Sequence, residues 1–214
     1  MSNEEESKED VSNQVEGELL RQQMEGEDKL RTIGLFGEVN STKAEEIIYA
    51  LYALDATKLK KKPVDYLDFG KGLVEELEPI ELIISTEGGD ATDMFSIYDT
   101  IRAFRGNMDI QTFGLGKVMS AGVAILAAGT VGKRKVTRNC RLMLHQASAG
   151  TVGSVNSMEN ELEEVKVLQD MYVRCVAENS NLSVKKIKKL FKSNANHYIS
   201  AEQAVEYGIA DEVV

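Results

Sequence analysis

The sequence predicts an α/β domain with a largely parallel sheet. Apolar segments of strand length alternate with amphipathic helical segments from residue 31 to the C-terminus, which is the pattern of repeated strand–helix units. Glycine-containing turns join several of these segments, and the clearest is the run from Thr86 to Asp90, which contains two adjacent glycines. The chain of 214 residues is 43% hydrophobic and 28% charged, which is typical of one folded domain with an appendage.

The first elements begin at Arg31. Residues 31–39 predict a strand, and the run Thr42–Glu45 matches a capping box that would begin a helix. The apolar stripe of this helix consists of Ile47, Ile48, Leu51 and Leu54. Residues 57–79 form an inserted polar connection with two prolines and two glycines, in which we expect a helical turn near residues 73–77.

The middle of the chain continues the alternation. Residues 80–85 predict a short buried strand, and the Gly-Gly turn leads from it into an amphipathic helix. The apolar residues of that helix are Met94, Ile97, Ile101 and Phe104. The next expected elements are a strand at 109–115, a helix at 120–129, and strands at 133–138 and 141–145.

The longest helix is expected at about residues 155–179, because its apolar residues keep a three-four spacing. These residues are Met158, Leu162, Val165, Leu168, Tyr172 and Cys175. Their apolar surface needs a partner, either within the domain or on a neighbouring subunit. A basic helix at 183–192 follows, then a helix from the capping box Ser200–Gln203 to Gly208, and a last strand at 209–214.

Most of the net charge of −10 lies near the N-terminus. Residues 1–30 contain ten acidic and three basic side chains, so we expect residues 1–28 to be a disordered acidic segment and residues 29–214 a single domain. No basic face favours nucleic acid, no apolar segment is long enough for a membrane, and no secretory signal is present. Only Cys140 and Cys175 occur, without metal-ligand spacing, so we expect a cytoplasmic protein with no metal and no cofactor.

Ser120 is the residue that most strongly indicates chemistry. It lies between an expected strand and an expected buried helix, where unpaired N–H groups and the helix dipole favour a developing oxyanion. A serine at such a junction is more commonly an N-cap than a nucleophile, so its surroundings decide. The pair Gly88–Gly89 can direct a backbone N–H at a substrate. Phosphate binding is the alternative use of such glycines, but no phosphate-binding fingerprint follows a strand here.

The base that a serine nucleophile requires has two histidine candidates. His145 ends a predicted strand, where a side chain can emerge above the sheet. The alternative for His145 is a buried histidine with a structural hydrogen bond. His197 lies just before the second capping box and is expected in a loop, which disfavours it as the base.

Several motifs in order resemble the ClpP family of self-compartmentalised serine peptidases, over residues 30–56 and 80–214. They are Ser85–Asp90, Met119–Gly122, Leu142–Gln146, Ser200–Ala204 and Glu206–Gly208. The resemblance implies a crotonase/ClpP-like spiral of β-β-α units. It also implies that Ser120 is the nucleophile, that His145 is the base, and that the backbone N–H groups of Gly89 and Ala121 form the oxyanion hole.

The resemblance further implies an assembly and a partner. Residues 146–180 would form a protruding handle that joins two heptameric rings, so we expect a homo-oligomer of seven or fourteen subunits. The substrate would be an unfolded polypeptide, delivered by an AAA+ unfoldase that spends the ATP.

Some positions depart from the family. Asn196 stands at the place of the aspartate that is the third triad residue, and an asparagine can orient the imidazole but cannot stabilise its charge. We therefore expect a Ser-His-Asn triad with reduced activity. Glu81 and Ile83 replace aromatic residues of the unfoldase docking cleft, and Glu87 replaces a proline beside the oxyanion hole.

Three functions are compatible with the sequence. The first is an active serine endopeptidase of ClpP type. The second is a weak or inactive subunit that serves as structure in a mixed barrel. The third is another activity of the crotonase fold, such as an acyl-CoA hydratase or a Ser-Lys peptidase in which Lys117 activates Ser120.

Overall fold

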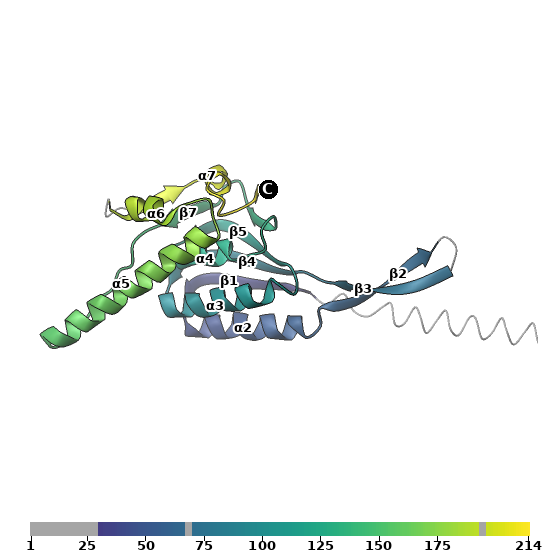
Figure 1. Ribbon diagram of the computed structural model, residues 1–214, viewed down its shortest axis with the longest axis horizontal. Helices are drawn as coiled ribbons and strands as arrows, with labels where there is room; N and C mark the ends of the chain where they lie inside the picture. The colour runs from purple at the N-terminus through teal and green to yellow at the C-terminus, as the bar shows by residue number, and fades with distance from the viewer. Residues whose placement is uncertain (1–29, 67–69, 193–195) are drawn as a thin grey trace, which may run out of the picture. The chain divides into compact units, whose positions relative to one another are not determined.

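A computed structural model describes residues 30–66, 70–192 and 196–214, and Figure 1 shows its helices and strands. The chain forms two compact units. The larger unit consists of residues 31–58 and 78–214, and the smaller one includes residues 59–77. The expected disordered segment at residues 1–28 lies outside the described residues.

The larger unit is built on a seven-stranded sheet. Five strands lie side by side in the order β1 (Thr32–Val39), β4 (Ile80–Gly89), β5 (Ile110–Met119), β6 (Arg134–Val136) and β9 (Glu212–Val213). Every pair along this path is parallel. The predicted α/β fold with a largely parallel sheet is therefore confirmed.

Strand β5 has a different neighbour along each half of its length. Its first half, Thr112–Gly114, pairs with β6, and its second half, Lys117–Met119, pairs with β7 (Arg141–Leu144). Gly116, with φ of +63°, permits the backbone to bend between the two halves. Strand β8 (His197–Ile199) then adds to β7 in the antiparallel direction.

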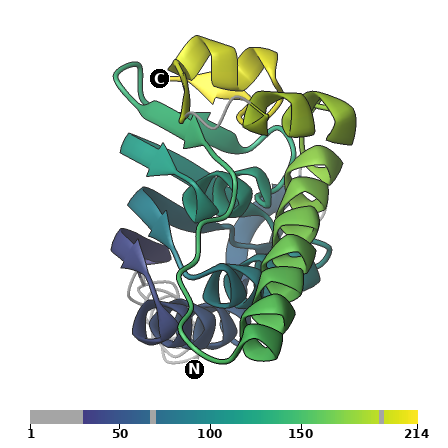
Figure 2. The same ribbon diagram turned by 90° about the vertical axis from the view of Figure 1, so that its left-hand side faces the viewer.

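Six described helices belong to the larger unit, and one of them lies buried among the strands and the other helices. The six are α2 (Ser41–Asp55), α3 (Ala91–Phe104), α4 (Ala121–Ala127), α5 (Val155–Glu178), α6 (Val184–Phe191) and α7 (Ala201–Glu206). All seven residues of α4 are buried, because this helix packs among β4, β5, α3 and α5. A helix enclosed on all sides is apolar on all sides, as the run from Val123 to Ala127 is. Figure 2 shows α5 lying along one side of the sheet and ending near α6.

The C-terminal end of α5 is held by a buried polar cluster. Arg134 is 4% exposed and donates to the backbone oxygen of Asn179 at 2.6 Å, while it also forms an ion pair with Asp211 at 2.6 Å. The side-chain oxygen of Asn179 accepts hydrogen bonds from Arg102 and Arg105. These bonds tie α5 to α3, β6 and the chain before β9.

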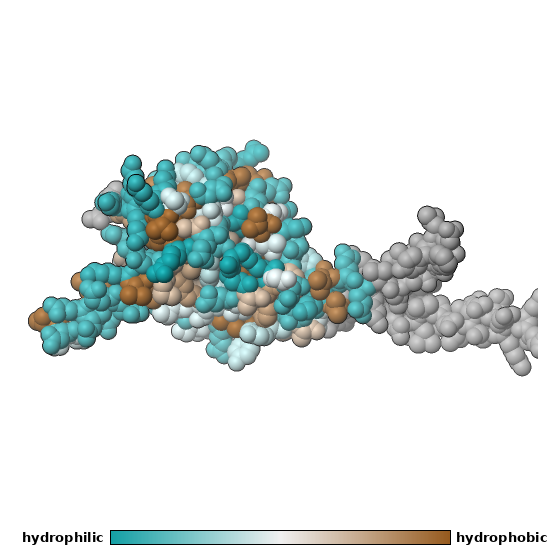
Figure 3. Space-filling view, viewed as in Figure 1, coloured by the Kyte–Doolittle hydropathy of each residue, from teal (hydrophilic) through white to brown (hydrophobic). Residues whose placement is uncertain are grey.

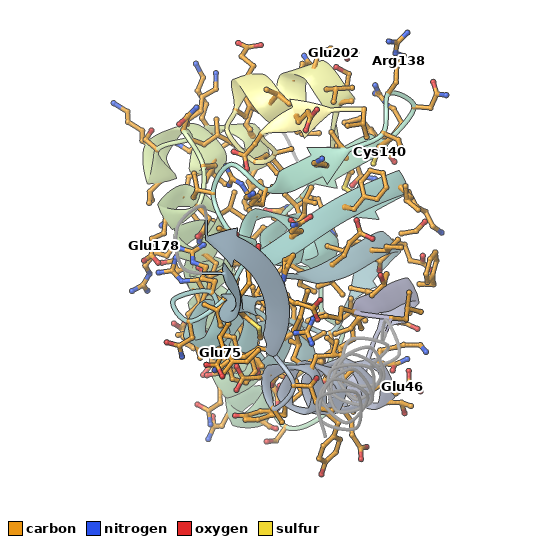
Figure 4. All side chains as sticks on the ribbon, turned by 90° about the vertical axis from the view of Figure 1, so that its right-hand side faces the viewer. Glu46, Glu75, Arg138, Cys140, Glu178 and Glu202 are labelled. Atoms are coloured by element: carbon orange, nitrogen blue, oxygen red, sulfur yellow. The ribbon has the colours of Figure 1, made fainter. Side chains whose placement is uncertain are left out.

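Side chains differ in burial between the core and the outer surface. Cys140 is fully buried, whereas Arg138 and Glu202 are exposed and point outward, as Figure 4 shows. Core residues of the strands alternate with partly exposed ones along β4, which is buried at Ile80, Leu82 and Ile84.

Three expectations about local structure are wrong. Helix α2 begins at Ser41, not at the capping box Thr42–Glu45, because the side chain of Asn40 accepts the N–H of Lys43 at 3.0 Å and caps the helix earlier. His197 lies in β8 and not in a loop, because the free edge of β7 pairs with it.

The third correction concerns the inserted segment. Residues 73–77 belong to β3 (Gly70–Leu77), which pairs antiparallel with β2 (Leu59–Tyr66), so no helical turn forms there. The register sets Lys60 opposite Glu76 and Lys61 opposite Glu75.

Candidate active site

Ser120 occupies a strained position between a strand and a helix. It follows β5 and precedes α4, and its backbone has φ of 53° and ψ of −119°. It is the one residue other than glycine with a positive φ in the part of the chain that the structure describes. Such a backbone costs on the order of 1–3 kcal/mol and persists only where the surroundings hold it. A sharp strand-to-helix turn of this kind exposes a serine hydroxyl above a sheet.

Glycines make the room for this turn. A Cβ at Gly88 would lie 2.6 Å from the Ser120 Cβ and 2.9 Å from the Met119 oxygen. A Cβ at Gly122 would overlap the side-chain methyl group of Thr86. Any larger residue at either position would push the strand-to-helix turn away from β4.

The Ser120 hydroxyl is directed at His145 and not at the helix. Its Oγ lies 2.8 Å from the His145 Nε2, and the side chain makes no capping bond to α4. The backbone makes the structural contacts instead, since the Ser120 N–H donates to the Met143 oxygen at 2.8 Å. The N-cap alternative therefore does not account for the hydroxyl.

His145 follows the last residue of β7 and is half-buried. Burial lowers the pKa of the imidazole from its ordinary value, because desolvation disfavours the charged form. The neutral imidazole is thus the main form at neutral pH. With Nε2 as acceptor of the Ser120 proton, the ring carries its own proton on Nδ1.

Two backbone N–H groups lie near Ser120. Ala121 is the first residue of α4, so its N–H comes before the first hydrogen bond of the helix, which the Val123 N–H donates to the Ser120 oxygen. Gly89 ends β4, where the next residue, Asp90, donates its N–H to Val39 of β1. Because successive N–H groups of a strand alternate in direction, the Gly89 N–H points away from β1, to the side where β5 and Ser120 lie.

A pocket of about 250 Å³ opens beside these groups. Ser120, Ala121, His145 and Gly89 line it together with an apolar wall. That wall consists of Ala91, Met94, Val165, Leu168 and Tyr172, from α3 and α5. The site thus combines a hydroxyl, a neutral imidazole, the backbone of Gly89 and Ala121 and an apolar recess, which are parts that acyl transfer uses.

The comparison with known protein families agrees with this geometry. The Clp protease family matches residues 16–214. The chain belongs to the Clp protease family. Proteolytic subunits of this family are serine peptidases, which places the chain among the hydrolases.

Individual Clp proteases are similar over most of the chain. The ATP-dependent Clp protease proteolytic subunit 1 of Corynebacterium glutamicum is 35% identical over 145 residues, which cover 66% of this chain and 68% of that protein. The subunit of the same name from Tropheryma whipplei is 30% identical over 191 residues, which cover 88% of this chain and 81% of that protein.

Asn196, the expected third triad member, directly precedes the first residue of β8. Leu144 of β7 pairs with His197 of β8, so one further step along both chains sets Asn196 opposite His145. The Asn196 residue is exposed, and no hydrogen bond between it and His145 is present among the described residues. The register of β7 and β8, extended by one residue, therefore makes Asn196 the backbone neighbour of His145.

Lys117 does not contact Ser120 in the described part of the chain. Its ammonium forms an ion pair with Glu87 at 2.8 Å, and both side chains are about half exposed. The hydrogen bond with Lys117 lowers the pKa of the Glu87 carboxyl. The pair joins β5 to β4.

Tyr172 is a site residue that sequence reasoning missed. It appeared only as a member of the apolar stripe of the long helix, but its hydroxyl donates to the Ser120 backbone oxygen at 2.9 Å. A buried tyrosine usually needs a hydrogen-bond partner for its hydroxyl, and this requirement could have indicated that Tyr172 makes a polar contact.

The described helices include none that is long and apolar enough to cross a membrane.

The lowered pKa of His145 predicts the acidic side of the activity profile. Acidification protonates the imidazole and removes the base, so kcat/KM should fall as the pH falls through the His145 pKa. Because burial lowers that pKa, the midpoint should lie below about 6.5, the ordinary histidine value. The measurement is kcat/KM for a fluorogenic peptide between pH 4.5 and 8.5, with circular dichroism as a control for unfolding. A midpoint at or above pH 7 would contradict a base desolvated in this way.

Proposed function

We propose that this chain is a serine endopeptidase that cleaves unfolded polypeptides, with Ser120 as nucleophile and His145 as general base. The observation that carries the proposal is the 2.8 Å contact between the Ser120 Oγ and the His145 Nε2 at the start of α4. Membership of the Clp protease family supports it independently.

The chemistry follows from the positions of the groups. The Ser120 oxygen attacks the carbonyl carbon of the scissile peptide bond while His145 Nε2 takes the hydroxyl proton. The carbonyl oxygen becomes an oxyanion, which the N–H groups of Ala121 and Gly89 stabilise. His145 then gives the proton to the leaving amine, and the acyl-enzyme remains on Ser120. Water, deprotonated by His145, hydrolyses this ester and restores the serine.

Asn196 is proposed as the third member of the triad. Its side-chain oxygen would accept a hydrogen bond from the His145 Nδ1–H and orient the ring, as asparagine does in Cys-His-Asn peptidases. The register of β7 and β8 supports this role. An amide carries no charge, so it does not stabilise the imidazolium that forms as Ser120 attacks, and we expect slower turnover than an aspartate would allow.

The pocket favours apolar side chains in the substrate. Its recess is lined by Met94, Val165, Leu168 and the ring of Tyr172, and about 250 Å³ holds one side chain of moderate size. An extended peptide would place that side chain in the recess and the scissile carbonyl over Ser120.

We also propose that the chain acts in rings of seven or fourteen copies that receive substrate from an AAA+ unfoldase. Helix α5 supports the assembly, because apolar side chains at Val155, Leu162 and Val167 are between 49% and 64% exposed. Figure 3 shows hydrophobic areas of this kind on an otherwise hydrophilic surface. The relatives named above are ATP-dependent, which supports an ATP-driven partner. Two free cysteines support a reducing compartment such as the cytoplasm.

Removing the nucleophile is the direct test of the proposed function. Ser120→Ala should abolish hydrolysis of a fluorogenic peptide, because the Ser120 Oγ is the hydroxyl that contacts the His145 Nε2 in the described site. Ser96→Ala is the matched control, since that hydroxyl lies on the exposed side of α3 and bonds to Thr92. Undiminished turnover by the Ser120→Ala protein would exclude the assignment. Absence of turnover in the unaltered protein would instead favour the structural subunit of a mixed barrel.

Asn196→Asp tests the third member of the triad. A carboxylate beside His145 stabilises the imidazolium, so kcat should rise about tenfold, within the ~10⁴-fold range known for this exchange in a serine triad. The same charge raises the His145 pKa, so the acidic midpoint of the pH profile should move upward.

The control for Asn196→Asp is Asn139→Asp, which adds an equal charge before β7, at the end of that strand remote from His145. It should change neither kcat nor the midpoint. If Asn196→Asp leaves kcat within twofold and the midpoint unmoved, the catalytic unit is a Ser-His pair without Asn196.

A further inference from the structure

Tyr172 holds the peptide group that joins Ser120 to Ala121. Its hydroxyl donates to the Ser120 carbonyl oxygen at 2.9 Å, and the Val123 N–H donates to the same oxygen at 3.0 Å. The second bond belongs to the first turn of α4. The first comes from α5, 52 residues further along the chain, so it is a tertiary contact with the strand-to-helix turn.

The Tyr172 side chain is fixed. The residue is 9% exposed and its ring stacks on Phe191 of α6, with ring centroids 6.4 Å apart and ring planes 18° apart. Burial raises the pKa of its hydroxyl far above the ordinary value, so it remains a protonated donor at every working pH. The hydroxyl therefore offers the Ser120 carbonyl a hydrogen bond from one defined direction.

Holding this carbonyl also sets the direction of the Ala121 N–H. A peptide group is planar and trans, so its C=O and N–H point in opposite directions and rotate together. Ser120 has a ψ of −119°, and a rotation of the following peptide plane would change that ψ together with the φ of Ala121. Such a rotation would turn the Ala121 N–H away from the position of the substrate oxygen.

We propose that Tyr172 is a positioning residue of the oxyanion hole, which acts through the Ser120–Ala121 peptide group. The inference rests on the proposed function, because it assumes that the Ala121 N–H stabilises an oxyanion formed when Ser120 attacks. A donor on the carbonyl side also polarises the amide and strengthens the N–H as a donor, in the way that connected hydrogen bonds reinforce one another.

A role limited to fold stability makes a different prediction. If the Tyr172 hydroxyl only stabilises the fold through its hydrogen bond, its removal would lower the melting temperature and leave kcat unchanged. Tyr98 supplies the matched case. It is 4% exposed, its hydroxyl accepts a hydrogen bond from Asn179 at 2.5 Å, and it lies outside the pocket.

The test compares Tyr172→Phe with Tyr98→Phe in the full-length protein, at a temperature well below both melting points. Both changes delete one buried hydroxyl and keep the ring. The two readouts are kcat and KM for a fluorogenic peptide, and Ki for a peptide boronic acid. The boronic acid forms a bond from its boron to the Ser120 oxygen, the serine proton passes to His145, and one boron-bound oxygen takes the place of the oxyanion.

For Tyr172→Phe we expect kcat to fall about tenfold, below the 10²–10³-fold loss for complete removal of an oxyanion donor. KM should stay within twofold, Ki for the boronic acid should rise about tenfold, and the acidic midpoint of the pH profile should not move. Tyr98→Phe should leave kcat and Ki within twofold of the unaltered protein.

The inference is overturned if Tyr172→Phe leaves kcat and Ki within twofold, or if kcat falls while Ki does not rise. A shift of the acidic midpoint would also overturn it, because Tyr172 would then act through His145. A failure of the proposed function gives a different result, because the unaltered protein would then show no hydrolysis that depends on Ser120. That result would contradict both the proposed function and the role of Tyr172.

Discussion

The site depends on the backbone of Ser120, which lies at φ 53° only because neighbouring elements hold it there. Strand β7 binds its N–H through Met143, and α5 binds its carbonyl through Tyr172. The glycine at position 88 leaves space for its Cβ. One residue is thus held from three directions, and its hydroxyl is the group left free for His145.

The divided strand β5 explains how these elements meet. Its first half belongs to the main path of the sheet, and its second half pairs with β7, which brings the residue after β7 beside the residue after β5. Those two residues are His145 and Ser120. The parallel direction of the β5–β7 pair is essential, because both strands then end at the same edge of the sheet. Burial of α4 beneath this edge excludes water from the base of the site.

Burial of His145 and the uncharged side chain of Asn196 both disfavour the protonated imidazolium. Desolvation lowers the pKa of the imidazole and keeps it neutral in the free enzyme, which suits a base. The same desolvation disfavours the imidazolium that forms during attack, and an asparagine at position 196 adds no compensating charge. The proposed oxyanion hole must therefore supply much of the transition-state stabilisation. The hydrogen bonds that fix the Ser120–Ala121 peptide are important for this reason.

The sequence predicted the site correctly where the chain has few residues of the required type, or where a backbone turn requires glycine. With two histidines and one Gly-Gly turn, few combinations with Ser120 were possible, and the pair Ser120 and His145 lies within hydrogen-bond distance. It failed where the decisive contact is not local. Asn40 caps α2 before the Thr42 motif because the preceding strand ends at Val39. The three residues of β8 are too few to show an alternating pattern, and the role of the Tyr172 hydroxyl depends on a serine 52 residues away.

The central claim is that His145 activates the Ser120 hydroxyl. Reaction of the purified protein with a peptidyl fluorophosphonate, followed by peptide mapping with mass spectrometry, tests it most directly, because the reagent bonds to an activated serine whatever the natural substrate is. The account predicts a single phosphonylated residue, Ser120, and a labelling rate that falls at least a hundredfold in the His145→Ala protein. An adduct on another residue, or an equal rate of labelling without His145, would contradict the account.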